Sequence, residues 1–163
     1  MPTVFTCEQV EQADFRIHYV DACMLGDSTD QQKVLSNIWM LTERRGATGN
    51  GETVVYFTAF NPEREPVALL VMANNNGSWV IEDLFSGQAG AGSALARFAM
   101  QWAIRDYGAT ANREITLTSL NATSCAFWQK MGFSMRNPLD RGHGLMIYRV
   151  PNSRPATPAG TSA

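Results

Sequence analysis

The sequence has few of the residues that most often carry metal or redox chemistry. Its 163 residues include only three cysteines and two histidines. Cys7, Cys23 and Cys125 form no C-x-x-C pair, and neither histidine is spaced from a cysteine as zinc ligands usually are. An odd number of isolated cysteines is typical of reduced thiols in a cytoplasmic protein. We therefore expect a cytoplasmic protein without a bound metal.

Long apolar runs and clusters of basic residues are also scarce. The longest apolar stretch, residues 67–73, is far too short to span a bilayer. The first residues lack the basic, apolar and small-residue succession of a signal peptide, so we expect none. The formal net charge is −2 and the largest basic cluster is the pair Arg44 and Arg45, which argues against a nucleic-acid surface. We therefore expect neither a membrane nor a nucleic acid among the partners.

The apolar content is sufficient for one folded domain. Hydrophobic residues make up 45% of the sequence, and a chain of this length can bury a substantial core. Residues 151–163 are rich in proline, serine and threonine and predict a disordered tail. We therefore expect one domain over residues 1–150, followed by this tail.

The first fifty residues carry the weakest patterns. Residues 15–20 alternate between apolar and polar side chains, which predicts a strand. Residues 27–30 offer helix caps, and apolar residues at roughly helical spacing over 34–41 predict a helix. Residues 44–52, RRGATGNGE, predict a loop.

Three consecutive strands are predicted next. They are rich in β-branched and aromatic residues and cover residues 53–60, 67–73 and 79–85. Turn signals lie between them at 61–66 and, with an Asn-Gly pair, at 74–78. The segment predicts an antiparallel meander.

Helices and strands alternate in the rest of the chain. Residues 93–107 and 121–131 predict helices, the second of which ends at Gly132. Residues 114–120 and 145–150 predict strands. The order β-β-β-α-β-α-β around one core implies a mixed α/β sheet.

A glycine-rich turn joins the strand at 79–85 directly to the helix that follows, in which Arg97 lies on the polar stripe. Gly87, Gly90 and Gly92 give the pattern G-x-x-G-x-G. Glycines let a backbone approach a ligand closely, and a helix start offers unpaired N–H groups, so the turn suits a phosphate-bearing cofactor. No lysine follows as in a P-loop, and Leu95 occupies the third glycine position of a dinucleotide fingerprint. The alternative is a plain strand–turn–helix connection with glycines for close packing.

A second motif follows the next strand, where residues 121–133 read NATSCAFWQKMGF. Together with the glycine turn it resembles the GNAT superfamily of acyl-CoA-dependent N-acyltransferases, whose members carry similar segments after their fourth and fifth strands. The resemblance covers about residues 54–150. It implies a single-domain α/β fold, with a mixed, mostly antiparallel central sheet flanked by helices and a splayed pair of strands for acyl-CoA. Residues 1–52 then form a variable acceptor-side region and residues 53–150 the core of an acyltransferase domain.

The resemblance implies acetyl-CoA, or another short acyl-CoA, as the cofactor. The pyrophosphate would lie on main-chain amides at the helix start, and the pantetheine arm would extend like an extra strand beside the fourth strand. Asn121 would contact the cofactor or cap the following helix, two compatible roles. The residues expected at the cofactor are Leu84, Phe85, Ser86, Gln88, Ala89, Gly90, Ala91, Gly92, Ser93, Asn121, Phe127 and Trp128.

The sequence departs from the family pattern at two positions. Gly87 stands where an arginine or glutamine usually begins the glycine motif, and Gln88 takes that place only if the loop shifts by one residue. Trp128 stands where relatives have a tyrosine that often protonates the leaving thiolate, and an indole N–H is not a usable acid. Tyr148, Tyr107 and water are the remaining proton donors, and we name Tyr148.

The reaction also needs a group that removes a proton, because an alkyl amine is mostly protonated near neutral pH. Glu82 and Asp83 lie in the fourth strand and point to opposite faces, so at most one of them faces the acceptor. The resemblance to polyamine-type relatives favours Glu82, and the alternative is a solvated strand residue. A backbone N–H near Leu84 or Phe85 would stabilise the oxyanion. Cys125 is a rival nucleophile that we interpret as a packed core thiol.

These observations predict an N-acetyltransferase that moves an acetyl group from acetyl-CoA to a primary amine of a small molecule or protein by direct attack. One alternative is a GNAT-like module that binds acyl-CoA and regulates a protein partner without catalysis. Another is an acyltransferase toxin acting on charged transfer RNA, which the slight negative charge disfavours. Relatives often pair, so the resemblance also implies a homodimer.

Overall fold

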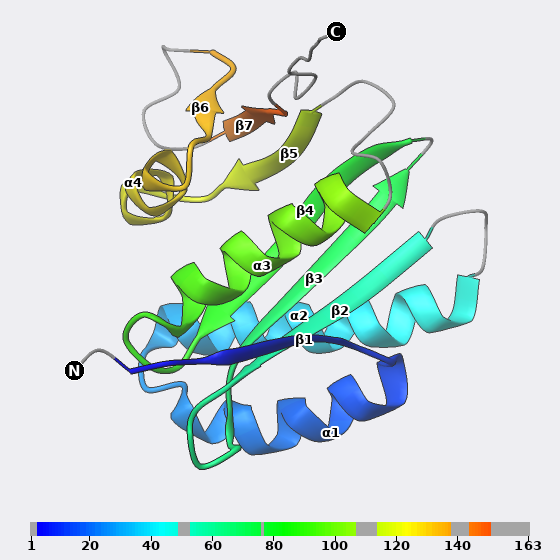
Figure 1. Ribbon diagram of the computed structural model, residues 1–163, viewed down its shortest axis with the longest axis vertical. Helices are drawn as coiled ribbons and strands as arrows, with labels where there is room; N and C mark the ends of the chain where they lie inside the picture. Colours follow the sequence, from blue (N-terminus) through cyan, green and yellow to red (C-terminus); the bar gives the residue numbers. More distant parts are fainter. Residues whose placement is uncertain (1–2, 49–52, 76, 107–113, 138–143, 151–163) are drawn as a thin grey trace, which may run out of the picture.

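The computed structural model describes residues 3–48, 53–75, 77–106, 114–137 and 144–150. Within these ranges, seven strands form one sheet in the order β1-β2-β3-β4-β5-β7-β6. Every neighbouring pair is antiparallel except β4 and β5, which are parallel (Figure 1). The single α/β domain with a mixed, mostly antiparallel sheet is therefore confirmed. The predicted tail lies outside the described residues.

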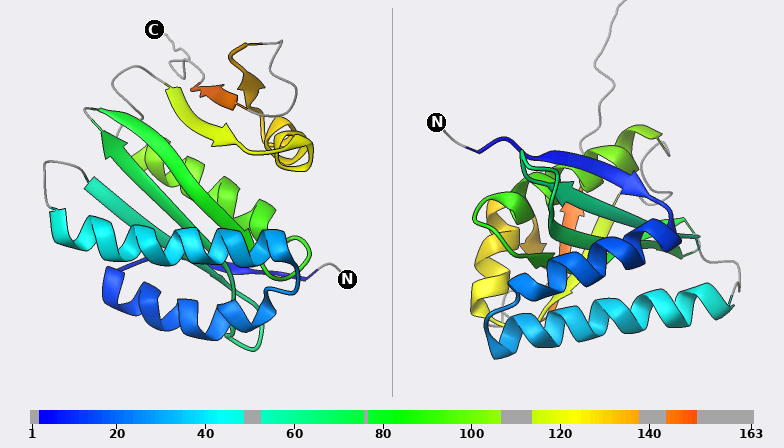
Figure 2. Two further views of the ribbon diagram at one scale, coloured as in Figure 1. Left: turned by 180° about the vertical axis from the view of Figure 1, so that it is seen from behind. Right: turned by 90° about the horizontal axis from the view of Figure 1, so that it is seen from below.

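Helices cover both faces of this sheet. On one face lie α1 (Gln12–Ala22), the short 3-10 helix η1 (Cys23–Leu25) and α2 (Thr29–Thr48), and on the opposite face lies α3 (Ala91–Asp106) (Figures 1 and 2). Each face has its own apolar cluster, one shared by α3 and α4 (Ala122–Lys130) and one by α1 and α2. The sheet therefore separates two differently built halves of the core.

The predicted antiparallel meander is confirmed as β2 (Thr53–Phe60), β3 (Pro66–Asn75) and β4 (Ser78–Ser86). Its second turn follows the Asn-Gly signal, because Gly77 adopts φ +87° and donates its N–H to the side-chain oxygen of Asn74 at 2.9 Å. Only glycine adopts this left-handed conformation without strain.

The strand predicted over residues 15–20 is wrong, because these residues belong to helix α1. Phe15, Tyr19 and Ala22 follow a helical spacing and face the core, whereas Ile17 and Val20 are 62% and 58% exposed. Apolar residues on both sides of the helix imitate the alternation of a strand. The strand of this region is instead β1 (Thr6–Val10), a short edge strand that pairs with β2.

The loop predicted over residues 44–52 is also wrong in its first part, because α2 continues to Thr48. One glycine inside a helix costs only about 1 kcal/mol relative to alanine, and the neighbouring arginines and alanine are adequate helix formers. Residues 49–52 lie outside the described residues.

The second half of the chain agrees closely with the sequence pattern. Helix α3, β5 (Glu114–Ser119), α4 and β7 (Gly144–Arg149) all appear where they were predicted, within two residues at the ends. The pattern did not reveal β6 (Ser134–Met135), which has only two residues.

Candidate functional site

Strand β4 is paired along one edge and largely open along the other. It pairs with β3 from Ser78 to Ser86 but with β5 only at Trp79 and Val80. Beyond Val80 the two strands diverge (Figure 1). An extended ligand between diverging strands can bond to backbone groups of the open edge, as an added strand would. The expected splayed pair of strands is therefore present.

A β-bulge interrupts β4 within the open part. Val71 of β3 pairs with Asp83, while the next residue, Met72, pairs with Ile81. Glu82 is therefore the extra residue of the bulge. A bulge changes the direction of nearby side chains and often lies beside a functional site.

The glycine turn brings the end of β4 into contact with the start of α3. Ala91 donates its N–H to the Gln88 carbonyl at 3.0 Å, and Gly90 adopts φ +87°. Within the described part of the chain, the amides of Ala89, Gly90 and Ser93 donate to no protein group. These amides lie at the positive end of the helix dipole and can bind an anion.

The turn is closely packed as well. The Gly92 N–H donates to the Ser86 hydroxyl at 3.0 Å, and this hydroxyl donates to the Gln88 carbonyl at 3.1 Å. A Cβ atom on Gly92 would lie 2.8 Å from the Ser86 Cβ, so no larger residue fits without movement. Ser86 thus caps α3 from the neighbouring strand. The close-packing interpretation holds for Gly92, and the turn still leaves other amides unpaired.

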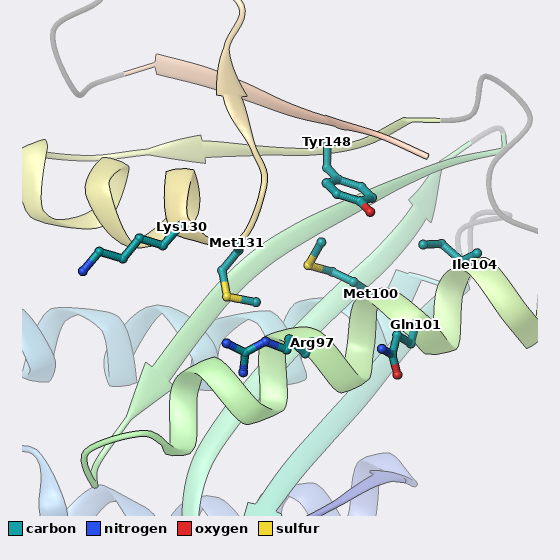
Figure 3. A pocket seen from close by; sticks show the side chains of 7 residues that line it. All are labelled: Arg97, Met100, Gln101, Ile104, Lys130, Met131 and Tyr148. Carbon is teal, nitrogen blue, oxygen red and sulfur yellow. The ribbon is translucent and has the colours of Figure 1, made fainter. Parts of the chain in front are cut away.

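A pocket of about 200 Å³ lies between α3 and the segment from α4 to β7. Arg97 and Lys130, one from each side, lie towards the end of the pocket where α3 begins, and Tyr148 points its hydroxyl towards α3 (Figure 3). The pocket therefore has a positively charged end and a mainly apolar remainder. Its lining residues are Arg97, Met100, Gln101, Ile104, Lys130, Met131 and Tyr148.

The sequence predicts a role for Tyr148 but none for Arg97 or Lys130. Arg97 lies on the polar stripe of its helix and is exposed. The available signal was position, because Arg97 lies one turn after the glycine turn and Lys130 ends the helix of the second motif. Tyr107, the other tyrosine considered, lies outside the described residues.

Apart from Lys130 and Met131, the residues of the second motif do not line the pocket. Asn121 caps α4, because its side-chain oxygen accepts the Ser124 N–H at 2.8 Å. Trp128 is 6% exposed and packs edge-to-face against the rings of Phe127 and Phe133. Cys125 is buried with its Sγ 3.5 Å from the Met135 Sδ, so it is a packed core thiol.

Asp83 makes two hydrogen bonds on the face of the sheet that α2 covers. Asn37 of α2 donates its Nδ2 to the Oδ2 of Asp83 at 2.7 Å, and the Leu84 N–H donates to the Oδ1 at 2.9 Å. Burial raises the pKa of the Asp83 carboxyl above its usual value, the two hydrogen bonds act in the opposite direction, and the charge of Glu82 adds to the increase.

No group of three or more histidine, cysteine, aspartate or glutamate side chains in the described ranges is placed to hold a metal ion. Among the same residues, no helix combines the length and the apolar character needed to cross a membrane.

No family model and no curated protein matches this sequence. Solved structures do match. The PaiA N-acetyltransferase of Thermoplasma acidophilum, in complex with coenzyme A, has a TM-score of 0.60 at 14% identity over 90% of this chain and 99% of its own. A chimera of the Vibrio cholerae spermidine N-acetyltransferase SpeG and hSSAT has a TM-score of 0.59 at 14% identity over 89% and 95%. The N-acetyltransferase PseH of Campylobacter jejuni has 0.55 at 10% identity over 89% and 97%.

These likenesses extend over nearly the whole chain and over nearly the whole of each neighbour. The chain therefore has the fold of the GNAT acetyltransferases, as the two sequence motifs predicted. At 10% to 14% identity the comparison establishes the fold, while the chemistry has to be argued from the residues themselves.

Proposed function

We propose that this protein is an N-acetyltransferase that moves an acetyl group from acetyl-CoA, or another short acyl-CoA, to a primary amine of a small molecule or protein. The observation that carries the proposal is the open edge of β4 beyond Val80, which leads to the glycine turn at the start of α3. An extended arm fits the open edge and a diphosphate fits the unpaired amides. The PaiA structure, a neighbour with the same fold, contains coenzyme A.

The positive end of the pocket supports the placement of the phosphates. Gly87 replaces the usual arginine or glutamine of the glycine motif, and a Cβ atom there would lie 2.8 Å from the Leu25 Cβ. No side chain can occupy this position unless η1 moves. Arg97 and Lys130 offer positive charge nearby and can neutralise phosphate in its place. We therefore add these two residues to the proposed cofactor site.

The proposed reaction is a direct attack by the amine on the thioester carbonyl, without an acyl-enzyme. A main-chain N–H near the bulge would stabilise the oxyanion, although the Leu84 amide already donates to Asp83. Tyr148, whose hydroxyl points into the pocket, or a water molecule would protonate the leaving thiolate. Glu82 as the base and the cofactor contacts of Phe127 and Trp128 stay predictions.

The nature of the acceptor is proposed from one neighbour. One structure with this fold is a spermidine N-acetyltransferase, which supports a small-molecule amine. The acceptor would then approach from the α1 and α2 face, opposite the pocket. A cytoplasmic location and a homodimer stay predictions.

A second candidate is an acyl-CoA-binding module that regulates a protein partner without catalysis. Trp128, at the position of the usual tyrosine, favours it because its ring is buried among aromatic side chains and supplies no acid. Both candidates require cofactor binding, so only turnover separates them.

Calorimetry with acetyl-CoA tests cofactor binding, which both candidate functions require. We expect saturable binding, and neither heat nor a thermal shift at about millimolar cofactor would contradict both candidates. A panel of primary amines that includes spermidine, with saturating acetyl-CoA, then measures the release of free coenzyme A. Steady release with any amine supports the enzyme, and binding without release supports the module.

A further inference from the structure

Side chains along the open part of β4 point to the two faces of the sheet in turn. Leu84 packs with the apolar cluster that includes α3, whereas Phe85 packs with the cluster of α1 and α2. Asp83 bonds to Asn37 of α2, so its carboxylate lies on the α2 face. A cofactor that enters from the α3 side would therefore have this carboxylate on the opposite side of the sheet, where an acceptor can approach.

The carboxylate also lies on the part of β4 that is not paired with β5. Asp83 follows the bulge residue Glu82 and comes three positions after Val80, the last residue paired with β5. It is partly exposed, so a solute can reach it. Hydrogen bonds from the Asn37 side chain and the Leu84 amide hold both carboxylate oxygens in one orientation.

We propose, on the basis of the acetyltransferase function proposed above, that Asp83 is the catalytic base that removes a proton from the acceptor amine, and that Asn37 is the residue that positions it. In this assignment Asp83 takes the role that the sequence predicted for Glu82, which instead provides the bulge and local negative charge. The acceptor is accordingly an amine that is cationic near neutral pH, since a carboxylate attracts the ammonium form before it takes the proton.

The proton and electron balance is complete with these groups. The ammonium group gives one proton to the Asp83 carboxylate, and the nitrogen lone pair forms a bond to the thioester carbonyl carbon. The C–S bond breaks and its electron pair leaves with sulfur. The second proton of the attacking nitrogen passes, through Tyr148 or water, to the thiolate. Asp83 then releases its proton to solvent, so the net products are the amide, coenzyme A and one proton.

Burial supports this role because it keeps the carboxyl a stronger base than a solvated aspartate. Glu82 on β4 is the titratable group whose charge acts on it, and Asn37, the partner from α2, is neutral. The hydrogen bond from Asn37 opposes the increase in the Asp83 pKa.

The test compares Asp83→Asn with Glu82→Gln and with Glu63→Gln, a control that removes an exposed carboxylate from the β2–β3 turn. The substrate is the best amine that the wild-type protein accepts from the panel. We expect Asp83→Asn to lower kcat at least about 100-fold and to leave acetyl-CoA affinity unchanged. We expect Glu82→Gln to lose less than about 10-fold, and Glu63→Gln to match the wild type.

Asn37→Ala provides a second readout. The substitution removes the Asn37 hydrogen bond, which lowers the Asp83 pKa. The acid limb of the profile of kcat against pH should therefore move to higher pH. Full turnover in a folded Asp83→Asn protein, a larger loss in Glu82→Gln, or an unmoved profile in Asn37→Ala overturns the assignment. If Asp83→Asn does not fold, the Asn37→Ala profile decides. An inactive wild type would instead contradict the proposed function, which keeps the two failures distinct.

Discussion

The two faces of the sheet offer different kinds of candidate binding surface. The α3 face carries both sequence motifs, and its glycine turn offers main-chain amides together with a pocket that has a positive end. The α1 and α2 face carries no motif, and its polar feature at the bulge is the bond between Asn37 and Asp83, 46 residues apart in sequence. A cofactor shared by many proteins can be bound by backbone that a short motif encodes. An acceptor specific to one protein depends on side chains brought together by the fold.

Of the substitutions that test the difference between the two faces, Gly92→Ala on the α3 face should have the largest effect. The new Cβ would lie 2.8 Å from the Ser86 Cβ, so β4 and α3 must separate where the diphosphate is proposed to bind. We expect a destabilisation of about 1–3 kcal/mol and a loss of acetyl-CoA binding of about 100-fold or more. Thermal unfolding and calorimetry measure the two effects. Arg105→Ala, on the exposed stripe of the same helix, is the control, and unchanged cofactor affinity in Gly92→Ala would place the diphosphate elsewhere.

Arg97→Ala and Lys130→Ala test the positive end of the pocket. Each removes a charge from the α3 side without touching the α2 face, so each should weaken acetyl-CoA binding by about 10-fold and leave kcat nearly unchanged. The loss should shrink as salt screens the interaction. Calorimetry at two salt concentrations measures both effects. An increase in the KM of the amine alone would assign the two charges to the acceptor.

On the α1 and α2 face, Asp83→Asn should also alter the pH dependence of the stability of the protein. Because burial raises the pKa of this carboxyl above 3.8, its contribution to the stability of the wild type is fully present below that value and is lost as pH rises through the pKa of the folded state. The amide does not titrate. The Tm of the variant minus that of the wild type should therefore increase from about pH 3 to about pH 7. A constant difference across this range would mean that the Asp83 carboxyl is not desolvated.

The smallest effect is expected from His18→Gln in α1. The His18 Nδ1 lies 3.0 Å from the buried Thr58 hydroxyl, and burial lowers the pKa of the imidazole below 6.5, despite nearby acidic residues that act in the opposite direction. Its neutral form therefore stabilises the protein above this pH, and that contribution is lost as pH falls through the lowered pKa. As pH falls from about 7 to about 5, the wild type should lose more stability than the variant. Denaturant unfolding measures this, and a change in amine KM would give His18 a place in the acceptor site instead.

The elements that local sequence patterns predict follow the same division between the two faces. The β2–β4 meander, α3, β5 and α4 were predictable because each is encoded by its own spacing and turn residues, such as the Asn121 cap and the left-handed Gly77 and Gly132. Helix α1 was not, because its apolar residues lie on both sides and the packing of Phe15 against β2 and β3 decided its conformation. Local spacing carries no information about such a partner.

Part of the candidate site could likewise be predicted from the sequence, and part could not. Its glycine turn and Asn121 could be found from contiguous residues, whereas Arg97 and Lys130 were visible only as separate surface charges until the fold placed them around one pocket.

The sequence by itself determined the strand–turn–helix that can hold a diphosphate, because glycines and a helix start act through the backbone and over a few residues. Only the tertiary structure decided where β4 leaves β5, which carboxylate of the Glu82–Asp83 pair bonds to α2, and which cations face the pocket. These features depend on strand pairing and on contacts between residues far apart in the chain. A local sequence pattern does not predict such contacts.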